Sequence, residues 1–269
     1  MDPLNRALAP FGDDIWQAIE DTAVEAARAV LTARRFLPVE GPFGLGLTAI
    51  EAGSDDIAEV ENPAEAVAIL GAPLSVPMLW RGFGLSLRRL AAHREHGQPL
   101  DLAAVIDAAS AMARLEERLI YHGDARAGLA GLLNAQGTLS VAGGDWSRID
   151  QALKDVLAAV TALDDDGHSG PYALAAAPHL YNGLFRRYAD SDLLQVDHLG
   201  RLCAAGIFKA AIPGAVIIDP RVGRLVVGQD LAAGFASLDG VHCRMFLSES
   251  LVLAIDDARA ICRIVLEEA

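Results

Sequence analysis

The sequence predicts a mixed α+β fold with connections between segments that lie far apart in the chain. Apolar residues recur at helical spacing over residues 13–35 and again over 101–123. From residue 206 onward they gather instead in short groups typical of strands, namely AVIID, RLVVG, VHCRMFL, SLVLAID and AICRIVL. The chain contains no internal repeat and no low-complexity linker, so helices and strands are expected in one mixed architecture.

The first helix is expected over residues 13–35. Asp13 and Asp14 are candidate caps at its start, because a carboxylate accepts hydrogen bonds from the free N–H groups there. The expected apolar face consists of Ile15, Trp16, Ile19, Ala23, Ala27, Val30 and Leu31. The prolines and glycines of PVEGPFGLG at 38–46 cannot continue a helix, so the structure is expected to change there.

Residues 43–80 alternate short apolar groups with glycine, proline and acidic residues. This pattern favours a long two-stranded excursion, although NPAEAVAILGA at 62–72 is also compatible with a helical turn or more. The segment has little core of its own. We therefore expect a neighbour to cover it, either from the same chain or from another subunit.

Four further helices are expected. The second helix begins near Pro99 and Asp101 and ends at Gly123. A third runs from a cap at Asp145 to the acidic DDDGHSG at 164–170. Two shorter helices, near 178–188 and 193–204, follow a strand at YALAAA.

Composition excludes several classes of protein. The 269 residues include 22 Lys and Arg against 36 Asp and Glu, a net charge of −14, which disfavours binding to nucleic acid. No run of about 20 residues lacks a charge, so no membrane span is expected, and the N-terminus shows no secretory signal. Cys203, Cys243 and Cys262 are widely spaced and are expected to be ordinary reduced side chains. We therefore predict a cytoplasmic protein.

The stretch RLEERLIYHGDARAGLAGLLN at 114–134 carries the residue types that acid/base chemistry uses. Glu116 and Glu117 are adjacent on a helix and point in different directions, so they do not easily converge on one substrate. A solvated or interface face is the expectation.

Other candidate sites are weaker still. GPFGLG at 41–46 is read as a turn, because it lacks the lysine and hydroxyl residue of a phosphate loop. His93 and His96 have no clear third metal ligand. The run Asp164 to Asp166 is expected to end a helix in a solvated loop, with calcium as a minority alternative. No nucleophile elbow and no assignable catalytic triad is present.

Several motifs in order resemble the family 1 encapsulins, which are bacterial nanocompartment shell proteins once called linocin-type bacteriocins. The resemblance covers essentially the whole chain and rests on LNRALAP, IWQAIE, ARRFLPVEGPFG, EERLIYHG, GLAGLLN, GPYALAAAPHLY, VGQDLAAGFAS and CRMFLSESLVLAI. It implies the Hong Kong 97-type fold of tailed-phage major capsid proteins. That fold has a peripheral domain, an axial domain and an extended loop that packs on neighbouring subunits.

The resemblance also implies a division of the chain into domains. The peripheral domain would comprise an N-terminal helix and lead-in, a spine-helix region and the closing strands, with the extended loop and the axial domain inserted between them. The N-terminal helix and lead-in are expected at 1–42, the spine-helix region at 81–136 and the closing strands at 225–269. The extended loop is expected at 43–80 and the axial domain at 137–224.

By resemblance, the function is that of a non-catalytic shell subunit that self-assembles into an icosahedral compartment. A sixty-subunit T=1 homo-oligomer is expected, without covalent crosslinks, because Lys154 and Lys209 are the only lysines and neither lies in the extended loop. The cargo would be a ferritin-like protein for iron storage or a dye-decolourising peroxidase, recognised through a C-terminal targeting peptide. A prophage-derived capsid protein that packages nucleic acid is the alternative.

The resemblance also suggests functional residues. Leu31, Arg34, Phe36, Asp230 and Leu231 are expected to bind the cargo peptide, although simple packing of the subunit is an open alternative. Tyr188, Asp190 and Asp192 are expected to ring a cation-favouring pore, unless they form a plain solvated loop. Arg88 and Arg89 occupy the region where some encapsulins hold a flavin, so no flavin or other cofactor is expected. No metal site is expected either.

Overall fold

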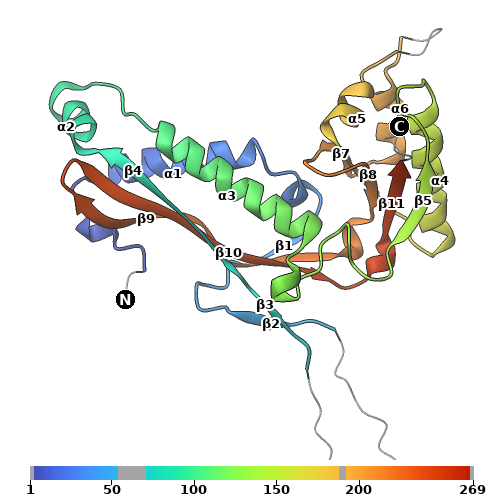
Figure 1. Ribbon diagram of the computed structural model, residues 1–269, viewed down its shortest axis with the longest axis horizontal. Helices are drawn as coiled ribbons and strands as arrows, with labels where there is room; N and C mark the ends of the chain where they lie inside the picture. The colour runs from blue at the N-terminus through green and yellow to red at the C-terminus, as the bar shows by residue number, and fades with distance from the viewer. Residues whose placement is uncertain (1–2, 54–70, 188–191, 267–269) are drawn as a thin grey trace, which may run out of the picture.

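The computed structural model describes residues 3–53, 71–187 and 192–266. The chain forms a long unit and a compact unit at one end of it (Figure 1). The long unit is a four-stranded sheet in the order β1-β9-β10-β4, and the compact unit contains a five-stranded sheet in the order β5-β11-β8-β6-β7. The predicted mixture of helices and strands is therefore present.

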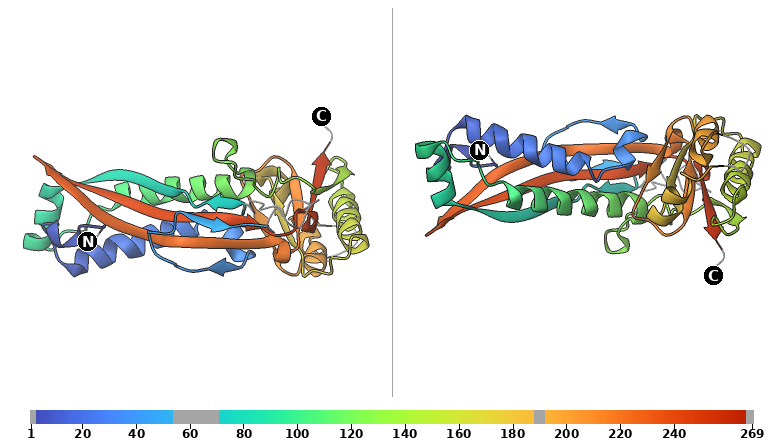
Figure 2. Two further views of the ribbon diagram at one scale, coloured as in Figure 1. Left: turned by 90° about the horizontal axis from the view of Figure 1, so that it is seen from below. Right: turned by 90° about the horizontal axis from the view of Figure 1, so that it is seen from above.

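Two antiparallel strands, β9 (Gly223–Asp239) and β10 (His242–Ile255), run the length of the long unit. β4 (Met78–Ser86) pairs antiparallel with β10, and the short β1 (Val39–Glu40) pairs parallel with β9. The helices α1 (Asp13–Arg28) and α3 (Ala103–His122) lie side by side on one face of this sheet (Figure 2). The core between helices and sheet includes Ile19, Val105, Met112, Leu79, Leu225 and Leu247.

The first helix is shorter than predicted. α1 ends at Arg28, and residues 33–35 form the separate 3-10 turn η2 (Ala33–Arg35). The backbone N–H groups of Thr32 and Ala33 donate to the Glu117 carboxylate at 2.8 and 3.0 Å. Because those donors are directed at α3, they are not available to continue α1.

The helix α2 (Leu87–His96) was not predicted. Its amphipathic signal is weak because Leu90 is the one buried side chain in it. The Ser86 hydroxyl accepts from the Arg89 N–H at its start, and Gly97 ends it with a φ of 63°. The following helix agrees closely with prediction, since α3 begins at Ala103 and ends immediately before Gly123.

The predicted two-stranded excursion is present in the described part of 43–80. β2 (Ala49–Glu51) pairs antiparallel with β3 (Pro73–Ser75). Leu47, Ile50 and Leu74 pack against Val226, Val252 and Ala254, on the sheet face opposite to the helices. The base of this arm is thus covered by its own chain. Most of the possible helix at 62–72 lies outside the described residues.

The described part of the compact unit contains five strands and three helices. Its strands are β5 (Leu139–Gly143), β6 (Ala173–Ala176), β7 (Gly206–Lys209), β8 (Ala215–Ile218) and β11 (Ile261–Leu266). Its helices are α4 (Gln151–Asp165), α5 (Pro178–Gly183) and α6 (Gln195–Leu202). Short 3-10 turns lie at Arg6–Leu8, Ala125–Ala127, Pro220–Val222 and Ala258–Ala260. α4 packs over one sheet face and buries Val156, Ala159 and Leu163 against Leu174, Ile217 and Ile264.

α4 begins six residues after the predicted cap. Asp145 does not cap this helix, because its carboxylate accepts from the Ser147 N–H at 2.7 Å and closes a local turn. The helix therefore starts at Gln151, after Asp150, which has a left-handed φ of 74°.

The closing strands differ from the predicted division of the chain. The range 225–269 was assigned to the peripheral domain, but β11 pairs with β5 and β8 in the compact unit. The break occurs at Asp257, whose carboxylate accepts from the Arg259 N–H and turns the chain away from β10. Residues 261–266 therefore depart from the prediction, and the remaining boundaries stay predictions.

Two findings bear on the class of protein. In the described ranges, no helix is long and apolar enough to cross a membrane. Cys203, Cys243 and Cys262 are buried free thiols, and burial raises their pKa values to about 12, 11 and 11. Thiols held protonated in this way are poor nucleophiles.

Candidate functional site

A cavity of about 550 Å³ opens between the end of α1, the second half of α3 and the strands β9 and β10. It is lined by Val24, Ala27, Arg28, Leu31, Arg34, Arg35, Met112, Ala113, Glu116, Asp230, Leu231 and Glu249. We name it the Arg34 pocket. Four of the five residues predicted to bind a cargo peptide meet there, namely Leu31, Arg34, Asp230 and Leu231.

The fifth, Phe36, does not line this pocket. It is buried in the main core, and its ring centroid lies 5.3 Å from that of Phe208. Its side chain packs the junction between the two units. Because Phe36 and Phe208 lie far apart in the sequence, local sequence spacing does not reveal this contact.

Arg34 lies at the centre of three carboxylates. Its Nε donates to Glu116 at 2.6 Å, and its Nη1 donates to Asp230 at 3.1 Å. Its Nη2 donates to Glu116 at 3.3 Å and also to Glu249. Glu116 and Glu249 are 1% and 3% exposed, whereas the Asp230 side chain is 63% exposed. One guanidinium thus connects two buried carboxyl groups to a third at the surface.

The prediction of a solvated or interface face is wrong for Glu116 and Glu117, because both are buried within the chain. The adjacent side chains do point to different partners, as expected on a helix. Glu116 binds Arg34, while Glu117 accepts from the N–H and hydroxyl of Thr32 and from the N–H of Ala33. Both carboxylates therefore fix the segment that follows α1.

Burial dominates the protonation of this cluster. Desolvation, followed by the negative charge of Glu116, raises the pKa of Glu249 to about 9. Desolvation also raises the pKa of Glu116, although its bonds to Arg34 oppose the shift. Burial alone lowers the pKa of Arg34, but its bond to Glu116 and the nearby carboxylates hold that pKa above its ordinary value. Arg34 is therefore always charged.

The pocket combines an apolar floor with this charged wall. Leu31, Leu231 and Met112 supply apolar surface, and Arg28 and Arg35 lie at the rim, where Arg35 Nη2 donates to the Arg28 carbonyl at 2.9 Å. Apolar contact with a few fixed polar groups is the geometry in which proteins hold a short peptide segment. The wall offers no nucleophile next to a base, so the arrangement favours binding over catalysis.

Sequence reasoning missed the two glutamates that hold Arg34. One signal was available for Glu249, which stands between Ser248 and Ser250 in the otherwise apolar FLSESLVLAI of β10. A carboxylate at the centre of a buried strand requires a partner, which Arg34 provides. Glu116 was considered together with Glu117 in the sequence, but nothing in the local pattern indicated Arg34 as its partner.

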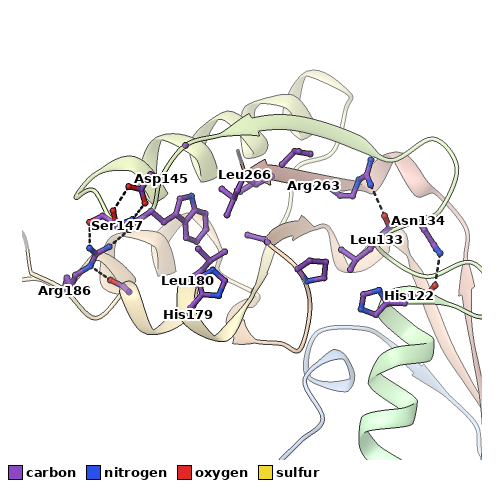
Figure 3. Close-up of a pocket in the computed structure, with 18 residues that line it drawn as sticks. His122, Leu133, Asn134, Asp145, Ser147, His179, Leu180, Arg186, Arg263 and Leu266 are labelled. Atoms are coloured by element: carbon purple, nitrogen blue, oxygen red, sulfur yellow. Dashed lines mark hydrogen bonds between the residues drawn. The ribbon is translucent and has the colours of Figure 1, made fainter. Parts of the chain in front are cut away.

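A second cavity, of about 920 Å³, lies where the end of α3 meets the compact unit (Figure 3). Arg263 Nη1 donates to the Leu133 carbonyl at 3.2 Å at one end of it. At the other end, Arg186 donates to the carbonyls of Gly183, Trp146 and Ser147. The bond of Arg263 therefore ties β11 to the segment that follows α3, whereas the bonds of Arg186 join α5 to the loop before α4 within the compact unit.

The predicted pore residues are only partly described. Tyr188 and Asp190 lie outside the described residues. Asp192 lies in the loop between α5 and α6, where it is fully exposed, and its Oδ1 is 3.8 Å from Arg187 Nη1. The pore assignment therefore stays a prediction.

The weaker metal candidates have other roles. His93 Nδ1 lies 2.7 Å from the Gln98 carbonyl, next to the end of α2. Asp164 accepts from the Tyr172 hydroxyl at 2.5 Å, and Asp166 pairs with Arg259. Within residues 3–53, 71–187 and 192–266, no group of three or more His, Cys, Asp or Glu side chains is arranged to hold a metal ion.

Comparison with known proteins gives a consistent result. The family model Linocin_M18, described as encapsulating protein for peroxidase, matches residues 1–252. The type 1 encapsulin shell protein EncA of Myxococcus xanthus is 30% identical over 274 residues, which cover 97% of this chain and 96% of EncA.

Solved structures show the same fold. The virus-like particle from Pyrococcus furiosus has a TM-score of 0.73 at 19% identity. The match covers 93% of this chain and 99% of the chain of that particle. The capsid of Myoviridae phage XM1 has a TM-score of 0.58 at 13% identity, and the match covers 87% of this chain and 90% of the phage chain. These likenesses confirm the predicted tailed-phage capsid fold.

Proposed function

Because the chain belongs to the family of type 1 encapsulin shell proteins, we propose that its copies form a closed, non-catalytic shell around a cargo enzyme. A homo-oligomer of sixty subunits with T=1 geometry is the proposed assembly, located in the cytoplasm. The two-stranded arm supports it, because an element that extends from the sheet can reach a neighbouring copy. Neither lysine of the chain lies in the arm, so the assembly is non-covalent.

The Arg34 pocket is the proposed site where the cargo is held. A C-terminal targeting peptide of the cargo would place apolar side chains on Leu31 and Leu231, and Arg34 with Asp230 would fix its register. The observation that carries this proposal is the meeting of these four predicted residues in one cavity. Many identical pockets in one shell would raise the effective concentration of the peptide, so a weak single contact is sufficient.

The cargo is proposed to be a dye-decolourising peroxidase or a ferritin-like protein. The family description names a peroxidase, and this supports the first choice. Iron storage would accompany the second. The pocket itself does not distinguish the two, because it would contact only the targeting peptide.

Assembly is tested by expressing the chain alone and examining it by size-exclusion chromatography and negative-stain electron microscopy. Uniform hollow spheres that elute in the megadalton range are expected. The ratio of absorbance at 260 and 280 nm should be that of protein, since a chain of net charge −14 is unsuited to packaging nucleic acid. A monomer or dimer as the main species would contradict the proposed shell, and a nucleic-acid spectrum would favour a capsid function.

The segment that contains Tyr188, Asp190 and Asp192 is the proposed pore lining. Five or more copies of two aspartates around a symmetry axis would attract cations such as Fe²⁺. Replacing Asp190 and Asp192 with asparagine is expected to slow Fe²⁺ uptake into loaded shells by about tenfold at low ionic strength. The control is Asp165→Asn, which removes an exposed acid at the end of α4. Equal uptake rates in the pore variant and the control would show that the loop has no role in transport.

A further inference from the structure

Arg263 brings a positive charge into the sheet of the compact unit. It lies on the inner strand β11, opposite Val216 of β8 and Ser140 of β5. The residues on either side of it, Cys262 and Ile264, are buried in the core beneath α4. Because side chains alternate along a strand, Arg263 faces the other side of the sheet. There it lines the cavity of about 920 Å³ at the junction of the two units.

The guanidinium of Arg263 has no acidic partner in the described part of the chain. Its Nη1 donates to the Leu133 carbonyl at 3.2 Å, and its Nε is buried without an acceptor. A half-buried cation is costly unless an anion or further acceptors satisfy it. The described residues therefore leave a positive charge uncompensated at this end of the cavity.

The opposite end of the cavity is already balanced. Arg186 donates to three main-chain carbonyls, and Asp145 lies at the same end (Figure 3). Hydrogen bonds from Ser147, followed by the charges of nearby arginines, lower the pKa of Asp145, so it stays ionised. The charges of Arg186 and Asp145 offset each other. An anion that enters the cavity is therefore attracted to the end that carries Arg263.

Two histidines add further donors. His122, at the end of α3, lies at the same end of the cavity as Arg263, and His179 of α5 lies between the two ends (Figure 3). The lining as a whole has two arginines and two histidines against one aspartate. The chain has a net charge of −14, so this excess of basic groups is a property of the cavity and not of the composition.

The space between the two ends has apolar walls. Leu133 and Leu180 contribute to them, and so does Val265, which is largely exposed although it belongs to a strand. A cavity of this volume with a few fixed polar groups is typical of sites for small molecules. Apolar walls that lead to an uncompensated guanidinium fit an organic molecule with an anionic group at one end.

We propose that this cavity binds a small organic phosphate, with the phosphate group at Arg263 and His122 and the apolar body against Leu180 and Val265. A guanidinium can hold two phosphate oxygens at once, which leaves the third oxygen for an imidazole. A carboxylate has only two oxygens and uses fewer of these donors. Binding makes and breaks no covalent bond. The inference goes beyond the proposed function, because it concerns a small molecule and not the cargo peptide.

The test is isothermal titration calorimetry on the purified protein, in the assembly that it forms, at pH 7.5 in a buffer without phosphate. The probes are phenyl phosphate, inorganic phosphate and benzoate. Phenyl phosphate is expected to bind at least tenfold more tightly than inorganic phosphate, because its ring contacts the apolar walls. It should also bind at least tenfold more tightly than benzoate, which lacks the third oxygen.

Replacing Arg263 with methionine removes the charge but keeps an unbranched side chain in the strand. The variant is expected to bind phenyl phosphate at least tenfold more weakly than the unmodified protein. The matched control is Arg126→Met, which removes an exposed arginine that pairs with Asp124 and does not line the cavity. Its affinity for phenyl phosphate should equal that of the unmodified protein.

Val265→Glu gives a second test that does not remove the arginine. Val265 stands two positions from Arg263 on β11, so both side chains lie on the same face of the sheet. A glutamate at this position would give the guanidinium an internal carboxylate and compete with a bound anion. The folded variant is expected to lose binding of phenyl phosphate and to melt at a higher temperature than the unmodified protein.

Several results would overturn this inference. One is that phenyl phosphate does not bind to the unmodified protein. Equal binding of inorganic phosphate would indicate a site for the free ion alone, and tightest binding of benzoate would assign the cavity to carboxylates. Unchanged affinity in Arg263→Met or in Val265→Glu would place the phosphate elsewhere. None of these results bears on shell assembly or on the Arg34 pocket, so the proposed function and this inference are tested separately.

Discussion

Replacing Arg34 with leucine is expected to lower the free energy of unfolding by about 3–5 kcal/mol, because it leaves two buried carboxyl groups without their cation. Glu116 and Glu249 are almost fully buried and both bind this guanidinium. Urea-induced unfolding of the variant and the unmodified protein, at equal concentration of assembled subunits, measures the change. Arg35→Leu is the control, because Arg35 is exposed and donates to one carbonyl, so its effect should stay within about 0.5 kcal/mol.

A second substitution shows whether charge is the cause. Adding Glu249→Gln to Arg34→Leu removes one uncompensated carboxyl group and should restore part of the lost stability. If Arg34→Leu unfolds at the same urea concentration as the unmodified protein, the three carboxylates do not depend on Arg34. If the double variant is less stable than Arg34→Leu, lost packing dominates over charge.

Leu231→Asp is expected to eliminate most cargo loading while the shell still assembles. The substitution removes apolar contact worth about 1.5–3 kcal/mol, which corresponds to roughly 10- to 150-fold in affinity. It also places a further carboxylate beside Asp230. The measurement is the ratio of cargo to shell protein in purified particles after co-expression.

The control for this variant lies on the same strand. Leu238 of β9 is 53% exposed and does not line the Arg34 pocket. Leu238→Asp should load cargo as the unmodified shell does, provided that it assembles. Normal loading of assembled Leu231→Asp shells would exclude the Arg34 pocket as the cargo site.

The helices and strands with strong periodicity could be predicted from the sequence, and those without it could not. The apolar positions of α3 recur over twenty residues, so the helix was predicted almost to its ends. α2 buries Leu90 alone, and a helix with one buried residue gives almost no periodic signal. The path of β11 was missed because strand pairing between 261–266 and two distant strands is a property of tertiary contacts, not of local pattern.

The pocket was predicted only in part, for a related reason. Arg34, Asp230 and the two leucines came from the resemblance to a family, not from their spacing. Glu116 lies 82 positions from Arg34, and Glu249 lies 215 positions from it. Contacts between residues so far apart in the sequence depend on how α3 and β10 pack against the end of α1. A local sequence pattern does not reveal that packing.

The same separations determine when the pocket comes into existence during synthesis. Its wall uses residues 34, 116, 230 and 249, so the hairpin of β9 and β10 must leave the ribosome before the cavity has all its sides. A nascent chain that ends before residue 240 has Arg34 and Glu116 but lacks Glu249 and the strand that carries it. If cargo is held at this pocket as proposed, its capture has to wait until β10 has left the ribosome.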